Sequence, residues 1–151
     1  DWLNANHLTQ EKVETSRFNN EERILRFFAF YYDLDRYKGK LASFLNEFMR
    51  SHKDLTENVK NEYANLLSRS LKVAMEIEEL STSKNVFEAV LIGIAANISA
   101  LETKGADVIN KLYKDVEGDK NFSEEALKEG LGSLEKVQKR INAAKIIFAR
   151  G

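Results

Sequence analysis

Proline is absent from this chain, although average usage would place about seven prolines in a sequence of 151 residues. Proline fixes φ and removes a backbone hydrogen-bond donor, so its absence permits long uninterrupted helices. Apolar residues recur at intervals of three and four almost throughout, which is the spacing of one helix face, and strand-like alternation is missing. We therefore predict an all-α fold, with residues 1–151 forming a single bundle of about six to eight helices.

The composition sets limits on partners and location. The chain carries 23 Lys and Arg against 24 Asp and Glu, a net charge of −1, so no global charge indicates a nucleic-acid or membrane partner. No apolar run is long enough to span a bilayer, which excludes a membrane anchor. Cysteine is absent, which excludes disulfides and thiolate chemistry and fits a reducing compartment. We expect a cytoplasmic protein.

The start of the sequence carries no initiator methionine, signal peptide or transit segment. It opens at Asp1 and Trp2. We therefore expect that the chain has been cut from a longer protein.

The most aromatic stretch of the sequence, residues 27–32, holds five aromatics in six positions. One set of apolar residues follows the i, i+3, i+4, i+7 spacing that predicts the core-facing side of a helix. This set is Ile24, Phe27, Phe28 and Tyr31. Phe30 and Tyr32 lie off that stripe, which predicts that the helix is covered on two sides. A platform that stacks nucleic-acid bases is the weaker alternative, because helical spacing already explains the cluster.

The rest of the chain divides into further helical segments. They are predicted at about residues 41–48, 56–80, 85–101, 107–118 and 134–148, with a short helix from Ser123. Gly39 is expected to adopt the left-handed conformation between the first two helices. Asp54 and Glu57 have the spacing of a capping box. Gly93 lies inside the most apolar segment, where close helix packing would explain a residue that disfavours helices.

Several catalytic and metal-binding patterns are missing from the sequence. His7 and His52 are far apart, and neither follows a glutamate by three residues as bundle di-iron sites require. Gly130 and Gly132 lack the rest of either nucleotide-binding motif. Neither a Gly-x-Ser-x-Gly elbow nor a His-Glu-x-x-His motif occurs. We predict no catalytic, cofactor-binding or metal site in this chain.

Two acidic groups are the remaining candidates for chemistry. Asp33 and Asp35 could offer carboxylates to a metal, but they fit the polar exit from a helix better. The group Glu76, Glu78 and Glu79 fits a solvated helix face. An enzymatic site in the chain alone would have to be assembled from these residues or His52.

The last helix carries the clearest charge asymmetry. Residues 133–151 hold five cations against one carboxylate, whereas residues 102–129 hold eight acidic and five basic side chains. The candidate nucleic-acid-binding residues are Lys136, Lys139, Arg140 and Lys145. The first three share a helix face and could contact phosphates. The alternative, which we favour, is that these cations pair with the acidic segment before them.

Residues 19–49, "NNEERILRFFAFYYDLDRYKGKLASFLNEFM", resemble the helical C-terminal part of a large prokaryotic family. Its members include GmrSD-type modification-dependent restriction enzymes and the phage-defence protein SspE. The family pattern "E-x-x-L-R-F" is matched by Glu22, Leu25, Arg26 and Phe27. The pattern "Y-x-G-x-L-x-x-F-L-N-x-F-M" is matched by Tyr37, Gly39, Leu41, Phe44, Leu45, Asn46, Phe48 and Met49. The family's "F-E-A" helix is matched by Phe87, Glu88 and Ala89, and "RINAA" from Arg140 is consistent with its close.

The resemblance implies a supporting role rather than catalysis. The family's activity resides in an N-terminal ParB-like domain, with a glutamine–arginine motif tied to nucleotide hydrolysis, and some members add an HNH nuclease domain. This sequence contains neither motif. The resemblance therefore implies a helical subdomain that completes a restriction or phage-defence NTPase or nuclease, with the ParB-like domain as its partner and DNA as a possible contact.

Arg23 and Arg26 are the residues we expect to orient this subdomain, by pairing with carboxylates inside the bundle or on the missing domain. An ordinary i, i+4 salt bridge between Glu22 and Arg26 is the simpler alternative. For the chain as a whole, the alternative function is a protein-interaction bundle of unknown partner with no nucleic-acid role.

Overall fold

The computed structural model describes residues 10–151, with side chains from Asn19 onward. This part of the chain contains seven α-helices, two 3-10 turns and no strand, which confirms the all-α prediction. In chain order the elements are α2 (Gln10–Asp33), η1 (Leu34–Arg36), α3 (Leu41–Ser51), α4 (Glu57–Ala74), α5 (Lys84–Ala96), α6 (Ile98–Leu101), α7 (Ala106–Gly118), η2 (Lys120–Phe122) and α8 (Leu134–Phe148).

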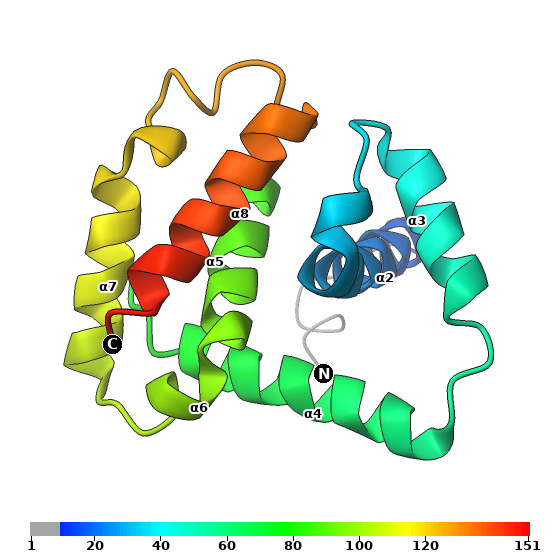
Figure 1. The fold of residues 1–151 in the computed structure, drawn as a ribbon, viewed down its shortest axis with the longest axis horizontal. Helices are drawn as coiled ribbons and strands as arrows, with labels where there is room; N and C mark the ends of the chain where they lie inside the picture. Colours follow the sequence, from blue (N-terminus) through cyan, green and yellow to red (C-terminus); the bar gives the residue numbers. More distant parts are fainter. Residues whose placement is uncertain (1–9) are drawn as a thin grey trace.

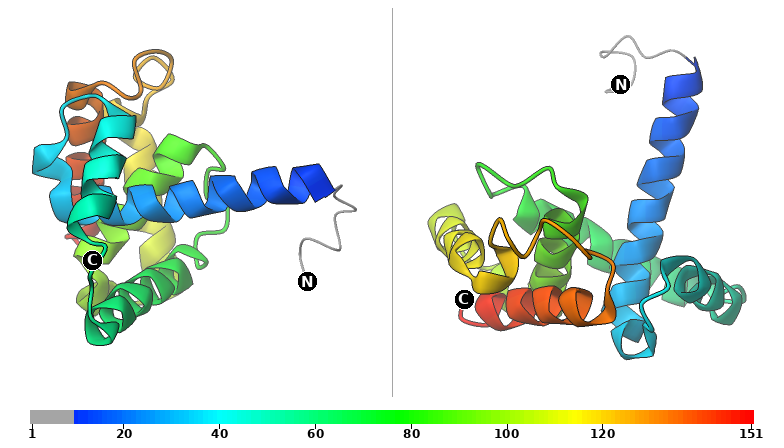
Figure 2. Two further views of the ribbon diagram at one scale, coloured as in Figure 1. Left: turned by 90° about the vertical axis from the view of Figure 1, so that its right-hand side faces the viewer. Right: turned by 90° about the horizontal axis from the view of Figure 1, so that it is seen from above.

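Helix α5 lies at the centre of the arrangement. It packs most extensively against α8, and it also contacts α4 and α2 (Figure 1). Helix α7 packs on the other side of α8, and α3 packs against α2. The N-terminal part of α2 extends well beyond the rest of the molecule (Figure 2). The polypeptide thus surrounds one buried helix and leaves half of another projecting from it.

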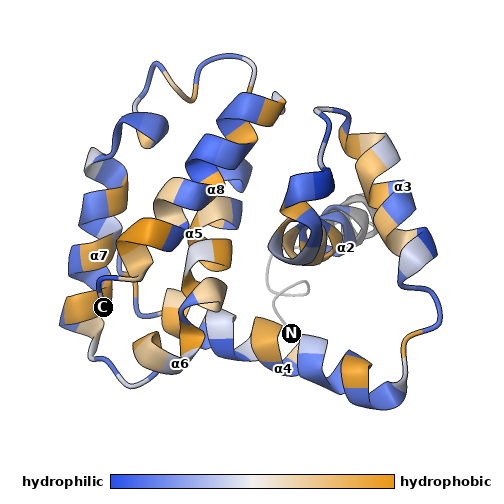
Figure 3. Ribbon diagram, viewed as in Figure 1, coloured by the Kyte–Doolittle hydropathy of each residue, from blue (hydrophilic) through white to orange (hydrophobic). Residues whose placement is uncertain are grey.

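The contact between α5 and α8 requires a glycine. A Cβ atom added to Gly93 would lie 2.8 Å from the carbonyl carbon of Ala144 and 2.9 Å from the ring of Phe148. The middle of α5 is apolar (Figure 3), and residues 88–95 are all buried. This confirms the prediction that Gly93 permits close helix packing.

The aromatic stretch of α2 is core, but its buried face is rotated from the predicted one. Phe27 and Phe30 are 2% and 0% exposed, whereas Ile24 is 45% exposed. Phe30 contacts the rings of Tyr37 and Phe44, both 5.0–5.1 Å away between centroids. The stripe prediction is therefore right for Phe27 and wrong for Ile24, and the burial of Phe30 confirms that α2 is covered on a second side. The rings of Tyr37 and Phe44 provide this second cover, whereas Ile24 lies where α2 begins to project from the other helices.

The remaining aromatics of α2 form a half-buried stack. Phe28 and Tyr31 are partly buried, and Tyr32 is 39% exposed. Both Phe28 and Tyr32 stack on Tyr63 of α4, at centroid distances of 5.1 and 4.5 Å. These rings therefore join α2 to α4 by packing against one another.

Several helix ends differ from their predicted positions. Thr56, rather than Asp54, caps α4 by accepting a hydrogen bond from the backbone N–H of Val59. The predicted 85–101 helix breaks at Asn97, whose side-chain amide donates to the carbonyls of Gly93 and Lys145. The segment after Ser123 forms turns rather than a helix. Gly39 has φ of 86°, as predicted for the connection before α3.

Candidate functional site

A buried ion pair joins α2 to α5 at the centre of the molecule. Arg26 donates from Nε to Oε2 of Glu88 at 2.6 Å and from Nη2 to Oε1 at 3.0 Å. Arg26 is 8% exposed and Glu88 is 7% exposed. Glu22, the partner in the simpler alternative, is at the outer limit of an ion pair with Arg26, at 4.0 Å. Arg26 thus pairs with a carboxylate inside the bundle, whereas Arg23 is exposed and unpaired among the described residues.

A second arginine lies beside this pair and gives it an excess of positive charge. Arg140 of α8 is 1% exposed, and its Nη2 donates to the carbonyl of Leu131 at 3.1 Å. Its Nε has no hydrogen-bond partner in the described part of the chain. Burial lowers the pKa of Arg140, and the charge of Glu88 opposes that effect. The buried carboxylate of Glu88 is therefore hydrogen-bonded to one guanidinium group and lies near enough to a second to affect its pKa. We call Arg26, Glu88 and Arg140 the charged cluster.

Tyr37 lies next to the charged cluster and connects it to the last loop. Its hydroxyl donates to the carbonyl of Gly132 at 2.5 Å, and its ring is 1% exposed. Burial raises the pKa of Tyr37. Its position follows from the turn that contains Gly39, which lies against the backbone of Leu134. The end of the aromatic segment is therefore fixed against the start of α8.

The motif residues of the family resemblance are mainly core. Phe44, Leu45 and Phe48 are buried on the inner face of α3, and Phe87 is half-buried. Asn46 is exposed, and Met49 is 47% exposed. Arg26, Tyr37 and Glu88 are the polar motif residues that the structure brings together.

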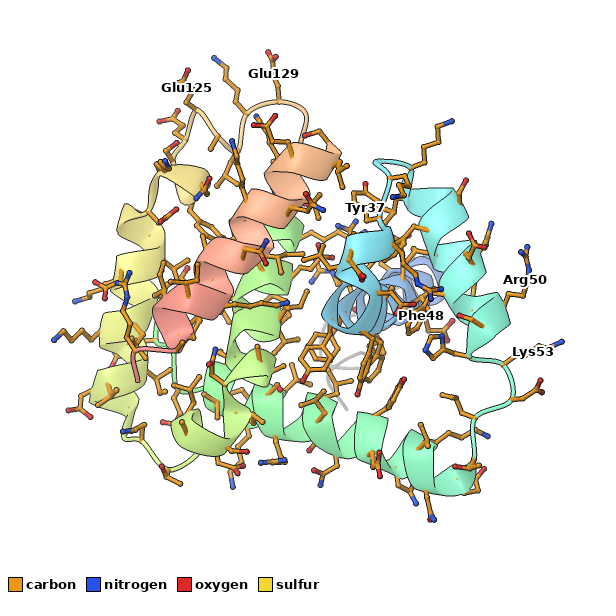
Figure 4. The ribbon with its side chains drawn as sticks, viewed as in Figure 1. Tyr37, Phe48, Arg50, Lys53, Glu125 and Glu129 are labelled. Atoms are coloured by element: carbon orange, nitrogen blue, oxygen red, sulfur yellow. The ribbon has the colours of Figure 1, made fainter. Side chains whose placement is uncertain are left out.

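Three side chains hold the loop of residues 123–133 through its backbone carbonyls. Lys136 donates from Nζ to the carbonyls of Ala126 and Glu129. Arg140 and Tyr37 supply the donors for the carbonyls of Leu131 and Gly132. Figure 4 shows the acidic side chains of Glu125 and Glu129 pointing outward from the same loop.

The four predicted nucleic-acid-binding cations do not share one exposed face. Lys136 is bound to the loop carbonyls, and Arg140 is buried. Lys139 is exposed, and it pairs with Glu135 one turn earlier rather than with residues 102–129. Lys145 is half-buried, and burial lowers its pKa. Periodicity placed these residues near one another correctly, but it did not reveal that the side chain of Arg140 points into the core.

The acidic candidates lie on the surface and remain separate. Asp33 is the last residue of α2, as expected for a polar helix exit, and Asp35 is exposed. Glu76, Glu78 and Glu79 are exposed as predicted, but they lie in the connection after α4 rather than on a helix. Within residues 10–151 no group of three or more His, Asp or Glu side chains could hold a metal ion.

His52 lies at the C-terminal end of α3. The Nδ1 atom of His52 lies 2.8 Å from the carbonyl of Phe48, and its ring stacks on the ring of Phe48 at 3.9 Å. His52 thus completes the end of α3. His7 lies outside the described residues.

An apolar groove opens beside the charged cluster, between α2, α4 and α5. We call it the α2 groove. Its volume is about 360 Å³. It is lined by Asn20, Arg23, Ile24, Phe27, Leu67, Leu71, Lys84, Phe87, Glu88 and Leu91. Glu88 therefore contributes to both the charged cluster and the wall of the groove.

Comparison with protein-family models, curated proteins and solved structures finds no match to this chain. In residues 10–151, no helix has both the length and the apolar character needed to cross a membrane.

Proposed function

We propose that the chain is the helical C-terminal subdomain of a GmrSD-like restriction or phage-defence protein of the prokaryotic cytoplasm. Its role is to complete and support an NTPase or nuclease whose catalytic residues lie in a preceding ParB-like domain. In this proposal the chain is structural, or contacts DNA, and is not catalytic by itself.

The observation that carries the proposal is the convergence of three motif segments. Arg26, Tyr37 and Glu88 come from separate parts of the resemblance, yet Arg26 bonds directly to Glu88 and Tyr37 lies close enough for their charges to affect its pKa. Glu88 interrupts an apolar run, where an unpaired carboxylate would be costly. The ion pair with Arg26 explains why a carboxylate can be buried at this position. The motif residues thus hold α2 and α5 together, which supports the proposal that the chain positions the other domains of a longer protein.

The proposed contact with DNA is supported by exposed cations around α3 rather than by α8. Five such residues take part in no ion pair among the described residues. They are Arg36, Lys38, Lys40, Arg50 and Lys53. The side chains of Arg50 and Lys53 point away from the molecule (Figure 4). Carboxylates at Asp33, Asp35, Glu47 and Asp54 lie within the same stretch of sequence, so we expect weak binding to the phosphate backbone.

The decisive experiment compares residues 1–151 with the product of the complete gene. We expect the complete protein to hydrolyse nucleotide or cleave DNA in a manner that depends on DNA modification, and residues 1–151 alone to do neither. The gene should encode a ParB-like segment with a glutamine–arginine motif upstream. A complete reading frame that starts near Asp1 would refute the proposal.

DNA binding has its own test, a titration of short duplex DNA at increasing salt. With three to five phosphates contacted, affinity should fall about 40- to 500-fold between 50 and 200 mM salt. Replacing Lys38 and Lys40 by Gln should reduce the salt dependence by about one phosphate contact each, whereas Lys139→Gln should leave it unchanged. Absence of binding at low salt would favour the alternative, a protein-interaction bundle with no nucleic-acid role.

A further inference from the structure

We infer that the α2 groove binds a small acid with an apolar body, which places its hydrocarbon part against α4 and α5 and its acidic group beside Arg23. This site is separate from the proposed DNA contact and does not depend on it. Its ligand class follows from the lining, the size and the charges of the groove.

The lining of the groove is apolar and partly open to solvent. Phe27 and Leu91 form buried parts of its wall, at 2% and 4% exposed. Leu67 and Leu71 of α4 are half-buried, as is Phe87 of α5. Ile24 is 45% exposed at the same groove. Covering these side chains with a hydrocarbon would remove apolar surface from water, which favours binding.

The size of the groove fits a small ligand. A volume of about 360 Å³ is near the lower end of the range for ligand pockets. It corresponds to about a dozen water-sized groups, at about 30 Å³ for each water. A carboxylic acid with an eight-carbon chain has about this number of non-hydrogen atoms or slightly fewer.

The charges at the groove favour an anion. The carboxylate that lines the groove, Glu88, is bound to Arg26, and Glu22 is bound to Lys84, another lining residue. Arg23 lines the groove, is exposed, and has no ion pair among the described residues. Its guanidinium group can therefore donate charge-assisted hydrogen bonds to an incoming carboxylate.

The groove is open to solvent on the side of α2 where Ile24 is 45% exposed. The N-terminal part of α2 projects away from the other helices (Figure 2), and the groove lies where α2 meets α4 and α5. An acid could approach along the exposed side of α2, with its hydrocarbon chain reaching Phe27 and Leu91.

Titration of the 151-residue chain with octanoate and with uncharged 1-octanol tests the inference. Amide chemical shifts from NMR would report both affinity and location. We expect saturable octanoate binding, with the largest shifts at Ile24, Leu67 and Phe87, and affinity at least about tenfold above that of octanol. Arg23→Gln should remove most of that difference, since a charge-assisted hydrogen bond is worth a factor of about ten or more.

Two further variants keep the test independent of folding. Ile24→Glu places a carboxylate at an already exposed position of the groove, so it should abolish octanoate binding without unfolding the chain. Arg50→Gln removes an exposed cation from α3 and should bind octanoate as the wild type does. Equal binding of octanoate and octanol, no effect of Arg23→Gln, or shifts located elsewhere would each refute the inference. The inference would also be wrong if octanoate did not bind and the amide chemical shifts of the same residues changed on dilution of the protein. That result would show that a second copy of the chain covers the groove.

Discussion

Replacing Glu88 by Gln gives the sharpest test of the charged cluster. Glu88 accepts two hydrogen bonds from Arg26, at 2.6 and 3.0 Å, and is the carboxylate that offsets the buried charge of Arg140. The substitution keeps the size of the side chain but removes the buried carboxylate beside Arg140, and it leaves Arg26 with only the distant carboxylate of Glu22, at 4.0 Å. Breaking a buried ion pair in this way typically costs about 3–5 kcal/mol.

That cost is a large share of the total stability of a domain, which is about 5–15 kcal/mol. For a chain of this length, each kcal/mol lowers the thermal midpoint by about 2–4 °C. Glu88→Gln should therefore melt about 6–20 °C below the wild type when unfolding is followed by circular dichroism. Glu102→Gln is the matched control, because it breaks the bidentate pair with Arg69 on the surface. This control should melt close to the wild type, since exposed pairs contribute little.

Arg140 makes the prediction more specific. In an isolated buried pair, replacing both partners by apolar residues often restores stability. Here Arg26→Met with Glu88→Leu should remain destabilised, because Arg140 stays buried without an anion. Adding Arg140→Met should recover stability. A wild-type midpoint for Glu88→Gln, or full recovery in the double variant, would refute the view that both arginines depend on one carboxylate.

Three further predictions concern packing and pH. Phe30→Ala should lower the free energy of unfolding by about 3–5 kcal/mol, because Phe30 is 0% exposed. Tyr32→Ala should lower it clearly less, because Tyr32 is 39% exposed. Equal losses of the two variants in denaturant unfolding would contradict this orientation of α2. Gly93→Ala should lower the thermal midpoint, because the added Cβ would lie within 3 Å of the backbone of Ala144. Gly118→Ala is the control and should be neutral or stabilising, because its Cβ would have no neighbouring atom within 4 Å. The opposite order of midpoints would contradict the close contact of α5 and α8. Burial, followed by the effects of Tyr63 and Tyr31, raises the pKa of Tyr32 from 10.0 to about 12, so the folded state keeps a proton that the unfolded state loses in this range. Stability should fall as pH rises from 10 to 12, and Tyr32→Phe should reduce the fall in a pH series of unfolding curves; an unchanged slope would show that Tyr32 does not contribute.

The helices were predictable because their apolar spacing is a local property of the sequence. Apart from the short helix predicted from Ser123, the predicted segments correspond to α2, α3, α4, α5 with α6, α7 and α8. Their ends depend on distant partners and were less predictable. Asn97 interrupts the segment by donating to the carbonyl of Lys145, which is 48 residues away. No local pattern around Asn97 encodes that bond.

The candidate site was predictable only in part, for the same reason. Glu88 is a lone carboxylate in an apolar run, a signal that could have indicated a buried cation opposite it, but only the fold identifies Arg26 and Arg140 beside it. The burial of Arg140 could not be inferred from its helical neighbours Lys136 and Lys139, which look equivalent in sequence. The α2 groove exists because α2 projects from the other helices near Ile24. Apolar periodicity identifies one face of a helix, but it does not show how much of that face other helices cover.

The bond between Tyr37 and Gly132 has a consequence for how the chain folds. It joins positions 95 residues apart, and the Arg26–Glu88 pair joins positions 62 residues apart. Individual helices can form in about a microsecond, but contacts between distant segments require a large loop to close first. The hydrogen bond that Tyr37 makes to the loop of residues 123–133 cannot form until the first and last thirds of the chain have met. A nascent chain can therefore form the Arg26–Glu88 pair between α2 and α5 before α8 has been synthesised, but a truncation before Ser133 would leave α5 without the helix that packs most extensively against it.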